Sequence, residues 1–245
     1  MSIILGFILT PIFYLFFVLF LIIFHPIQWI SLKLGGYCAH KKSVDTLNFF
    51  LHYSLLLTFN WLRLKKKVSI PTDRPILFIS NHQSMFDIPG LIYYFRKHHG
   101  KFVSKIELSR AKIPSIPFNL VHGGAANIDR KDPEQSIREI KKLANNMSAK
   151  KWSAFIFPEG TRTKDGEMRT FKTGGIETFI QLVPDLLIVP VAITGSYALV
   201  RKGYFPLMPF NKITWEVLDP IEPKDRPIGE IVSELEAVIK NSVSK

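Results

Sequence analysis

The chain has 245 residues, enough for one medium-sized domain with a buried core and an additional segment. Its 32 Lys and Arg against 20 Asp and Glu give a formal charge of +12, which suits nucleic acid, an anionic membrane surface or a phosphorylated ligand. The single cysteine, Cys38, excludes an intrachain disulfide and is typical of a reducing compartment.

The N-terminal segment is the most apolar part of the chain. Residues 3–24 are almost wholly hydrophobic, and the first charged side chain is Lys33. A helix of this length, at roughly 1.5 Å per residue, extends about 30 Å and matches the hydrocarbon core of a bilayer. No basic region precedes the run and no small-residue cleavage site follows it, so we do not expect a cleaved signal peptide. The sequence predicts a membrane helix with a kink at Pro11.

A second apolar stretch, residues 47–62, has basic residues on both sides. Two full membrane spans would place these basic groups on opposite sides of the bilayer, which the preference of Lys and Arg for the cytoplasm disfavours. The open alternatives are one span followed by an interfacial helix, a hairpin within one leaflet, or a buried hairpin of a soluble protein. We expect residues 1–66 to form a hydrophobic two-helix membrane anchor, and residues 67–245 to form a domain on the cytoplasmic face.

Positive charge is concentrated directly after this apolar part. Residues 63–112 hold eleven Lys and Arg but three Asp and Glu, whereas residues 219–245 hold four and six. This placement favours membrane headgroups over nucleic acid as the anionic partner.

The rest of the chain alternates short β-rich runs with helical patterns. The runs are residues 76–80, 101–104, 153–157, 186–193 and 212–217, and the helical patterns are residues 87–97, 132–147, 174–183 and 227–243. Continuous apolar strands separated by helices predict an α/β fold with a largely parallel mixed sheet covered by helices, preceded by the membrane-embedded two-helix segment.

One polar cluster, "NHQSMFD" (residues 81–87), follows the run at residues 76–80. The Asp87 carboxylate can fix the tautomer of the His82 imidazole and leave its other nitrogen as a proton acceptor. The alternative is a helix cap beside an incidental histidine. The chain has no G-x-S-x-G motif and no Cys/His metal spacing, so we expect the base to act directly on a substrate hydroxyl or water, without a metal or cofactor.

A second cluster, "PEGTR" (residues 158–162), follows the run at residues 153–157. Gly160 lets the backbone approach a ligand, and Arg162 can make a forked contact with phosphate. Lys105 and Arg130 add positive charge after other apolar runs. Glu159 with Arg162, and Asp129 with Arg130, could instead form surface ion pairs.

Taken together, the ordered blocks "NHQSMFD", "KIEL", "GGAANIDR", "FPEGTR", "FKTGG" and "VPVAI" resemble the PlsC-type lysophosphatidate acyltransferases, which carry an H-x4-D motif. The resemblance covers roughly residues 60–220. It implies acyl transfer from acyl-CoA or acyl-carrier protein to the sn-2 hydroxyl of 1-acyl-glycerol-3-phosphate, giving phosphatidate. Asn127 departs from the family, which usually has an aromatic or bulky apolar residue there.

The resemblance also assigns roles to residues. His82 matches the general base and Asp87 its orienting partner. The positions it associates with the glycerol-phosphate acceptor are Lys105, Arg130, Glu159, Gly160, Thr161 and Arg162. The implied partners are a phospholipid membrane surface, lysophosphatidate and the thioester donor.

Three other functions stay open at this stage. The same chemistry could act on glycerol-3-phosphate or on another lysophospholipid. A lipid hydrolase could use the same His–Asp pair to activate water, and a non-catalytic protein could bind lipid without turnover.

Overall fold

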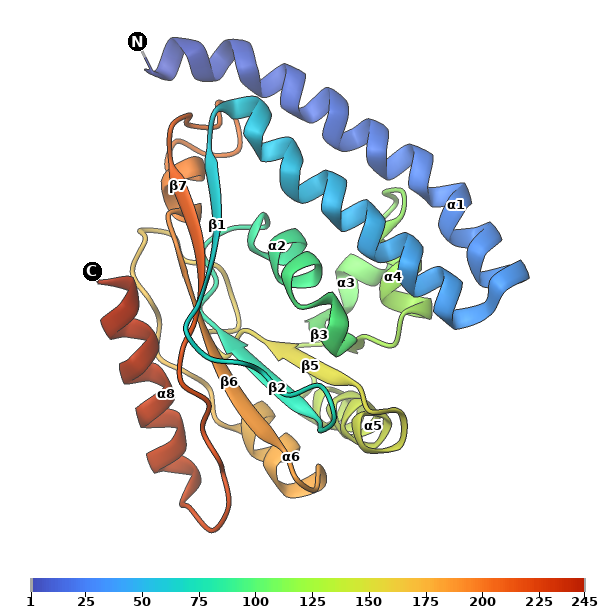
Figure 1. Ribbon diagram of the computed structural model, residues 1–245, viewed down its shortest axis with the longest axis vertical. Coiled ribbons are helices and arrows are strands. Elements are labelled where there is room, and N and C mark those ends of the chain that lie inside the picture. The colour runs from blue at the N-terminus through green and yellow to red at the C-terminus, as the bar shows by residue number, and fades with distance from the viewer. Residues whose placement is uncertain (1, 245) are drawn as a thin grey trace.

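A seven-stranded mixed sheet organises the computed structural model, which describes residues 2–244 (Figure 1). Its strands are β1 (Trp61–Lys66), β2 (Ile76–Ser80), β3 (Gly100–Lys105), β4 (Ala126–Ile128), β5 (Ser153–Ile156), β6 (Leu187–Thr194) and β7 (Lys212–Val217). They lie in the order β1-β7-β6-β2-β5-β3-β4. Only the β6–β7 pair is antiparallel; the other neighbours are parallel. The predicted α/β fold with a largely parallel mixed sheet is confirmed.

Helices cover both faces of this sheet. They are α2 (Asp87–Tyr94), α3 (Ile106–Ser109), α4 (Ile116–His122), α5 (Pro133–Lys150), α6 (Gly174–Leu182), α7 (Ser196–Val200) and α8 (Ile228–Val243), with 3-10 turns at Ser54–Thr58 and Arg96–His98. One core lies between the sheet and α5, α6 and α8, and a second core lies between the sheet and α2 with the N-terminal helices. Asp132 caps α5 by accepting a hydrogen bond from the Gln135 amide, and Pro133 takes the first helical position.

The N-terminal segment is a helical hairpin. The helix α1 (Ser2–Tyr53) contains one residue with non-helical dihedral angles, Gly36 (φ 65°, ψ −165°). The chain reverses there, so residues 2–35 form a first leg and residues 37–53 a second leg beside it (Figure 1). Glycine is suited to this reversal because a left-handed φ costs it little. The helical dihedrals continue through Pro11, the predicted site of a kink.

The second leg begins earlier than predicted and ends earlier. The sequence placed a helix at residues 47–62, whereas the structure ends the helix at Tyr53 and starts strand β1 at Trp61. Because β1 pairs with β7 along its whole length, residues 61–66 belong to the sheet and not to the expected anchor of residues 1–66.

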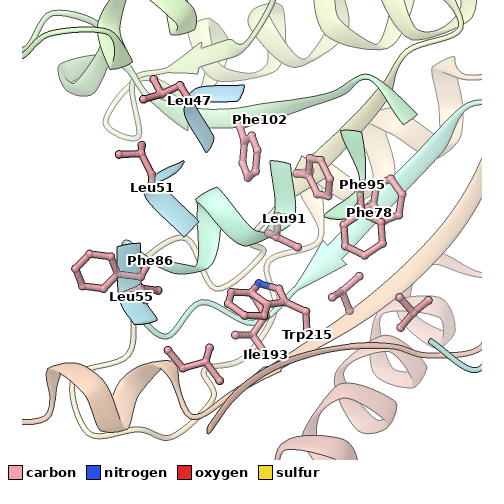
Figure 2. Packing of buried hydrophobic residues seen from close by; sticks show 14 of the residues in the cluster. Leu47, Leu51, Leu55, Phe78, Phe86, Leu91, Phe95, Phe102, Ile193 and Trp215 are labelled. Carbon is pink, nitrogen blue, oxygen red and sulfur yellow. The ribbon is translucent and has the colours of Figure 1, made fainter. Parts of the chain in front are cut away.

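The second leg is part of the core. Leu47 and Leu51 of this leg, and Leu55 in the 3-10 turn that follows it, are at most 3% exposed and belong to the same cluster as Leu91 and Trp215 (Figure 2). Full burial of each such side chain stabilises the fold by about 1.5–3 kcal/mol. The hairpin is therefore attached to the domain through close packing of its second leg.

The first leg has two different faces. Thr10, Phe13 and Phe17 recur at helical spacing and are buried against the rest of the molecule. The opposite face is apolar as well, yet it is exposed: Ile8, Leu15 and Ile22 are 54–65% accessible. A large exposed apolar face of this kind marks an interaction surface.

Candidate active site

The polar clusters meet at one edge of the sheet. β2, β5, β3 and β4 are parallel neighbours, so their carboxyl ends point the same way. His82 follows β2, the loop of residues 157–162 follows β5, Lys105 ends β3, and Arg130 follows β4. Ligands of open α/β sheets bind outside this edge.

His82 and Asp87 form a hydrogen-bonded pair. His82 Nδ1 lies 2.9 Å from Asp87 Oδ2, and the same oxygen accepts hydrogen bonds from the amides of Gln83 (2.7 Å) and Ser84 (2.8 Å). Asp87 is completely buried, whereas the His82 side chain is 13% exposed. This arrangement favours the tautomer with the proton on Nδ1. His82 Nε2 has no hydrogen-bond partner within residues 2–244, so it is free to accept a proton.

Phe157 fixes the plane of the imidazole. Its ring stacks on the His82 ring with a centroid distance of 4.0 Å and an interplanar angle of 12°. The residue belongs to the "FPEGTR" block, where sequence reasoning gave it no role.

Glu159 holds the backbone of the site together. Its Oε1 accepts a hydrogen bond from the His82 amide (2.7 Å), and its Oε2 accepts one from the Arg169 amide (2.9 Å). The side chain is 4% exposed, and this burial raises the pKa of the carboxyl although both hydrogen bonds lower it. Each oxygen accepts one backbone N–H, so Glu159 braces the site, and its predicted contact with the acceptor stays a prediction.

A further backbone contact supports the same loop. The amide of Thr163 donates a hydrogen bond to the His82 carbonyl (3.0 Å). The backbone of His82 is therefore bound on both its N–H and its C=O by the segment that follows β5.

Arg162 and Arg130 supply positive charge without bound carboxylates. Neither guanidinium forms an ion pair within residues 2–244, so the predicted alternative of surface pairs with Glu159 and Asp129 is not found. Partial desolvation lowers the pKa of Arg130; Glu107 raises it, and the charge of Arg162 lowers it further. Two positive charges that repel each other at an exposed edge favour the binding of an anion between them.

Tyr204 orients Arg162. Arg162 Nη1 donates a hydrogen bond to the Tyr204 hydroxyl, and the guanidinium lies 5.6 Å from the centre of the Tyr204 ring. The Tyr204 carbonyl accepts a hydrogen bond from the Tyr14 hydroxyl (2.9 Å) on the first leg of the hairpin. The hairpin thus contacts the segment that positions Arg162. No local pattern identified Tyr204, because its place depends on the path of the whole chain between α7 and β7.

Gly160 has the left-handed conformation that the turn requires (φ 72°). A Cβ built on it would lie 3.3 Å from Lys172 Nζ, so the Lys172 ammonium is close to this loop. Thr161 and Lys105 are exposed at the same edge. Lys172, from the "FKTGG" block, is an additional cation that the sequence analysis did not name as a site residue.

Asn127 has a structural place. It lies in β4, where its side chain accepts a hydrogen bond from Ser104 (2.9 Å) on β3 and donates one to the Leu120 carbonyl (2.9 Å) at α4. The Asn127 side chain, which departs from the family pattern, therefore links β3, β4 and α4 through hydrogen bonds.

Comparisons with known proteins agree on one family. The acyltransferase family model matches residues 62–194. The 1-acyl-sn-glycerol-3-phosphate acyltransferase of Limnanthes douglasii is 27% identical over 213 residues, covering 87% of this chain and 70% of that protein. The enzyme of the same name from Cocos nucifera is 32% identical over 152 residues, covering 61% of this chain and 46% of its own length.

A solved structure extends the similarity to the whole chain. The crystal structure of the 1-acyl-sn-glycerophosphate (LPA) acyltransferase PlsC from Thermotoga maritima superposes with a TM-score of 0.81 at 25% sequence identity. The match covers 100% of this chain and 97% of that one, so it includes the N-terminal hairpin as well as the sheet.

Proposed function

The chain belongs to the acyltransferase family, and from this premise we propose that it transfers a fatty acyl group from acyl-CoA or acyl-carrier protein to the sn-2 hydroxyl of 1-acyl-glycerol-3-phosphate, giving phosphatidate. The observation that carries the proposal is the His82–Asp87 pair at a sheet edge that also presents Arg130 and Arg162, which have no carboxylate partner within residues 2–244. The likeness to named lysophosphatidate acyltransferases supports the choice of acceptor.

In the proposed reaction His82 is the general base. Its Nε2 takes the proton of the acceptor hydroxyl as that oxygen attacks the thioester carbonyl carbon. The new C–O bond forms, the C–S bond breaks, and the proton passes from the imidazolium to the departing thiolate. A positioned base of this kind contributes about 10²- to 10⁴-fold in rate. Asp87 keeps the imidazole in the reactive tautomer and stabilises the imidazolium.

The acceptor phosphate is the proposed ligand of the cationic edge. Arg162 and Arg130 would bind it through forked hydrogen bonds, with Lys105 and Lys172 adding charge and the backbone at Gly160 and Thr161 close by. Binding of the phosphate places the neighbouring hydroxyl next to His82. This positioning lowers the entropic cost of bringing the hydroxyl and the base together.

The hairpin is the proposed membrane-binding element. Residues 2–58 contain a helix long and apolar enough to cross a bilayer. Because the second leg packs into the domain and the first leg lies along it, we favour a hairpin within one leaflet, with the catalytic domain on the cytoplasmic face. Substituting Leu15 and Ile22, both exposed on the first leg, by Lys tests this idea. The double variant should fold but no longer float with vesicles, and unchanged flotation would contradict it.

The function itself is tested by product analysis. The purified full chain is incubated in phospholipid vesicles with acyl-CoA and lysophosphatidate, and the lipids are identified by mass spectrometry. The proposal predicts phosphatidate. Free fatty acid without a diacyl product would identify a hydrolase, and no product would favour a lipid-binding protein. A panel with glycerol-3-phosphate and other lysophospholipids, at equal concentration, separates the remaining acceptors.

A further inference from the structure

A second cationic site lies at the opposite edge of the sheet from His82. A cavity of about 50 Å³ lies between the second leg of the hairpin, the start of β3 and α4. Its polar lining includes Lys41, Asp45, Arg96 and Lys101. Lys101 and Lys105 are four residues apart on β3, so about 13 Å separates this cavity from the active-site edge along the strand.

Lys101 is a buried cation without a hydrogen-bond acceptor. The residue is 8% exposed, and its ammonium group has no hydrogen bond or ion pair within residues 2–244. Its Nζ lies 4.8 Å from the centre of the Tyr37 ring and 4.6 Å from that of Trp152. These aromatic faces stabilise the charge, but its three N–H groups still lack conventional acceptors. The ammonium nitrogen keeps access to the cavity that Lys101 lines, so a ligand there can accept its hydrogen bonds.

The neighbouring side chains add to the excess of positive charge around Lys101. Lys41 is paired with Asp45 and also donates to the Arg96 carbonyl. Lys150 lies 4.6 Å from the Trp152 ring and adds to the positive potential at Lys101. Burial lowers the pKa of Lys101, and the charges of Lys41 and Lys150 lower it further, while Asp45 raises it. The resulting pKa is about 7. Arg96 brings the cluster to four cations and one carboxylate, and its guanidinium also donates to the Tyr93 carbonyl (2.8 Å) and lies 4.7 Å from the centre of the Tyr93 ring.

The cavity has the size of a small oxyanion. One water needs about 10–15 Å³ of such space, so about 50 Å³ accommodates roughly four oxygen-sized atoms. A phosphate or sulfate group has four oxygens. We propose that this cavity binds a tetrahedral oxyanion, held by Lys101, Lys41 and Arg96.

The source of the oxyanion can be a lipid or the solution. The cavity adjoins the turn of the hairpin, where Leu34 is 86% exposed and Lys33 and Lys42 add positive charge. If the hairpin lies in a leaflet, as proposed above, the phosphate of an anionic lipid headgroup is within reach of this turn. Free inorganic phosphate has the same recognition chemistry. The site itself does not depend on the acyltransfer reaction.

Sulfate is a suitable probe because it keeps both charges between pH 6 and 8.5. The thermal midpoint of the full chain in neutral detergent is measured at pH 6 with increasing sulfate, against chloride at equal ionic strength. We expect a saturable increase for the wild type and none for Lys101→Met. Lys212→Met, which changes an exposed lysine at the start of β7, should retain the increase. Because Lys101 loses its charge near pH 7, sulfate affinity should be weaker at pH 8.5 than at pH 6. His40 lines the same cavity and His99 lies near Lys101, and burial lowers the pKa of each, so Lys101→Met should remove most of this pH dependence.

The Lys101→Met variant should fold, because it removes an unpartnered buried charge and keeps an unbranched side chain between the two rings. If it does not fold, Arg96→Gln is the second variant, since Arg96 is exposed and its loss should weaken sulfate binding several-fold. A wild type without a saturable increase, or variants that respond like the wild type, would overturn the proposal.

Flotation distinguishes the two sources. The wild type, Lys101→Met and Lys212→Met are mixed with vesicles of phosphatidylcholine, with or without phosphatidylglycerol. A loss of about fivefold for Lys101→Met, only on vesicles containing phosphatidylglycerol, assigns the site to a lipid headgroup. Equal flotation together with a lost sulfate response assigns it to a free anion. Neither readout involves acyl transfer, so failure here is distinct from failure of the proposed reaction.

Discussion

The two edges of the sheet bury charge in opposite ways. At the carboxyl edge the buried groups are acids, Asp87 and Glu159, and the backbone donates hydrogen bonds to both. The cations there, Arg130 and Arg162, stay exposed. At the amino edge the buried group is a cation, Lys101, and no protein acceptor reaches it within the described chain.

This difference separates the charged groups that stabilise the fold from those that are available to bind a ligand. A buried charge with its hydrogen bonds satisfied holds the fold in one conformation, as Glu159 does for His82. An exposed cation, or a buried one without acceptors, is ready to bind an anion. Asp87 Oδ2 faces three donors, although its Oδ1 has no partner within residues 2–244. Asp87 and Glu159 are therefore expected to affect turnover and stability, whereas Arg162 and Lys101 are expected to affect binding.

The largest effect is expected at Asp87. Asp87→Asn keeps an oxygen that can accept the hydrogen bonds of Asp87 Oδ2 but loses the negative charge that stabilises the His82 imidazolium. We expect kcat for acyl transfer to fall about 10²- to 10⁴-fold. The measurement is steady-state turnover in vesicles. Asp219→Asn, an exposed residue after β7, is the matched control and should stay within about twofold. A similar small effect at Asp87 would remove the carboxylate from the mechanism.

Arg162 should act on one substrate only. Losing a hydrogen bond to a charged group costs about 1.5–3 kcal/mol, so Arg162→Ala should raise the KM for lysophosphatidate roughly 10- to 100-fold. The KM for acyl-CoA should hardly change. Tyr204→Phe removes only the hydroxyl that orients Arg162, and it should raise the acceptor KM several-fold. Equal increases for both substrates would contradict the assignment of Arg162.

Glu159 should affect the stability of the fold and the turnover rate rather than substrate binding. Glu159→Gln places an amide N–H₂ against one of two backbone N–H donors, and it should lower the free energy of unfolding by about 1–3 kcal/mol. We expect a lower kcat with an unchanged acceptor KM, measured together with the thermal midpoint. An intact midpoint with a raised acceptor KM would instead show a direct contact with substrate.

The smallest expected effect concerns the pH dependence of stability. The folded-state pKa of Lys101 is about 7, below the ordinary value for lysine, so above pH 7 the unfolded chain binds more protons than the folded chain. The free energy of unfolding should therefore rise with pH, by about 1 kcal/mol between pH 7 and 8.

Thermal midpoints of the wild type and Lys101→Met, measured without oxyanions at both pH values, check this dependence. The difference between the two chains should change by about 2–4 °C, with the wild type gaining as pH rises. A difference that does not vary with pH would show that Lys101 keeps an ordinary pKa.

The sequence was sufficient where the signals are local. The five predicted strand runs and the four helical patterns are present, and the His82–Asp87 pair forms because both residues belong to one loop and the helix that follows it. Parallel neighbours then bring the separate loops to one edge. That step needs only the rule that ligands gather at carboxyl ends.

Long-range contacts explain what the sequence could not provide. β1 is a strand because residues 61–66 pair with β7, which is distant in sequence, and nothing in "WLRLKK" distinguishes it from the end of an apolar helix. The bracing contacts of Glu159 were not predicted, because its two backbone donors, His82 and Arg169, lie in other parts of the chain. In the sequence Lys101 looks like an ordinary surface lysine, because the two aromatic residues that enclose it, Tyr37 and Trp152, are distant in the chain.

The most direct test of the account is His82→Ala in a single-turnover assay with acyl-CoA and lysophosphatidate, combined with a measurement of lysophosphatidate binding to the same vesicles. The account predicts that formation of phosphatidate falls at least about 100-fold while the affinity for lysophosphatidate changes little. A variant that still forms phosphatidate at close to the wild-type rate would contradict the assignment of His82 as the base.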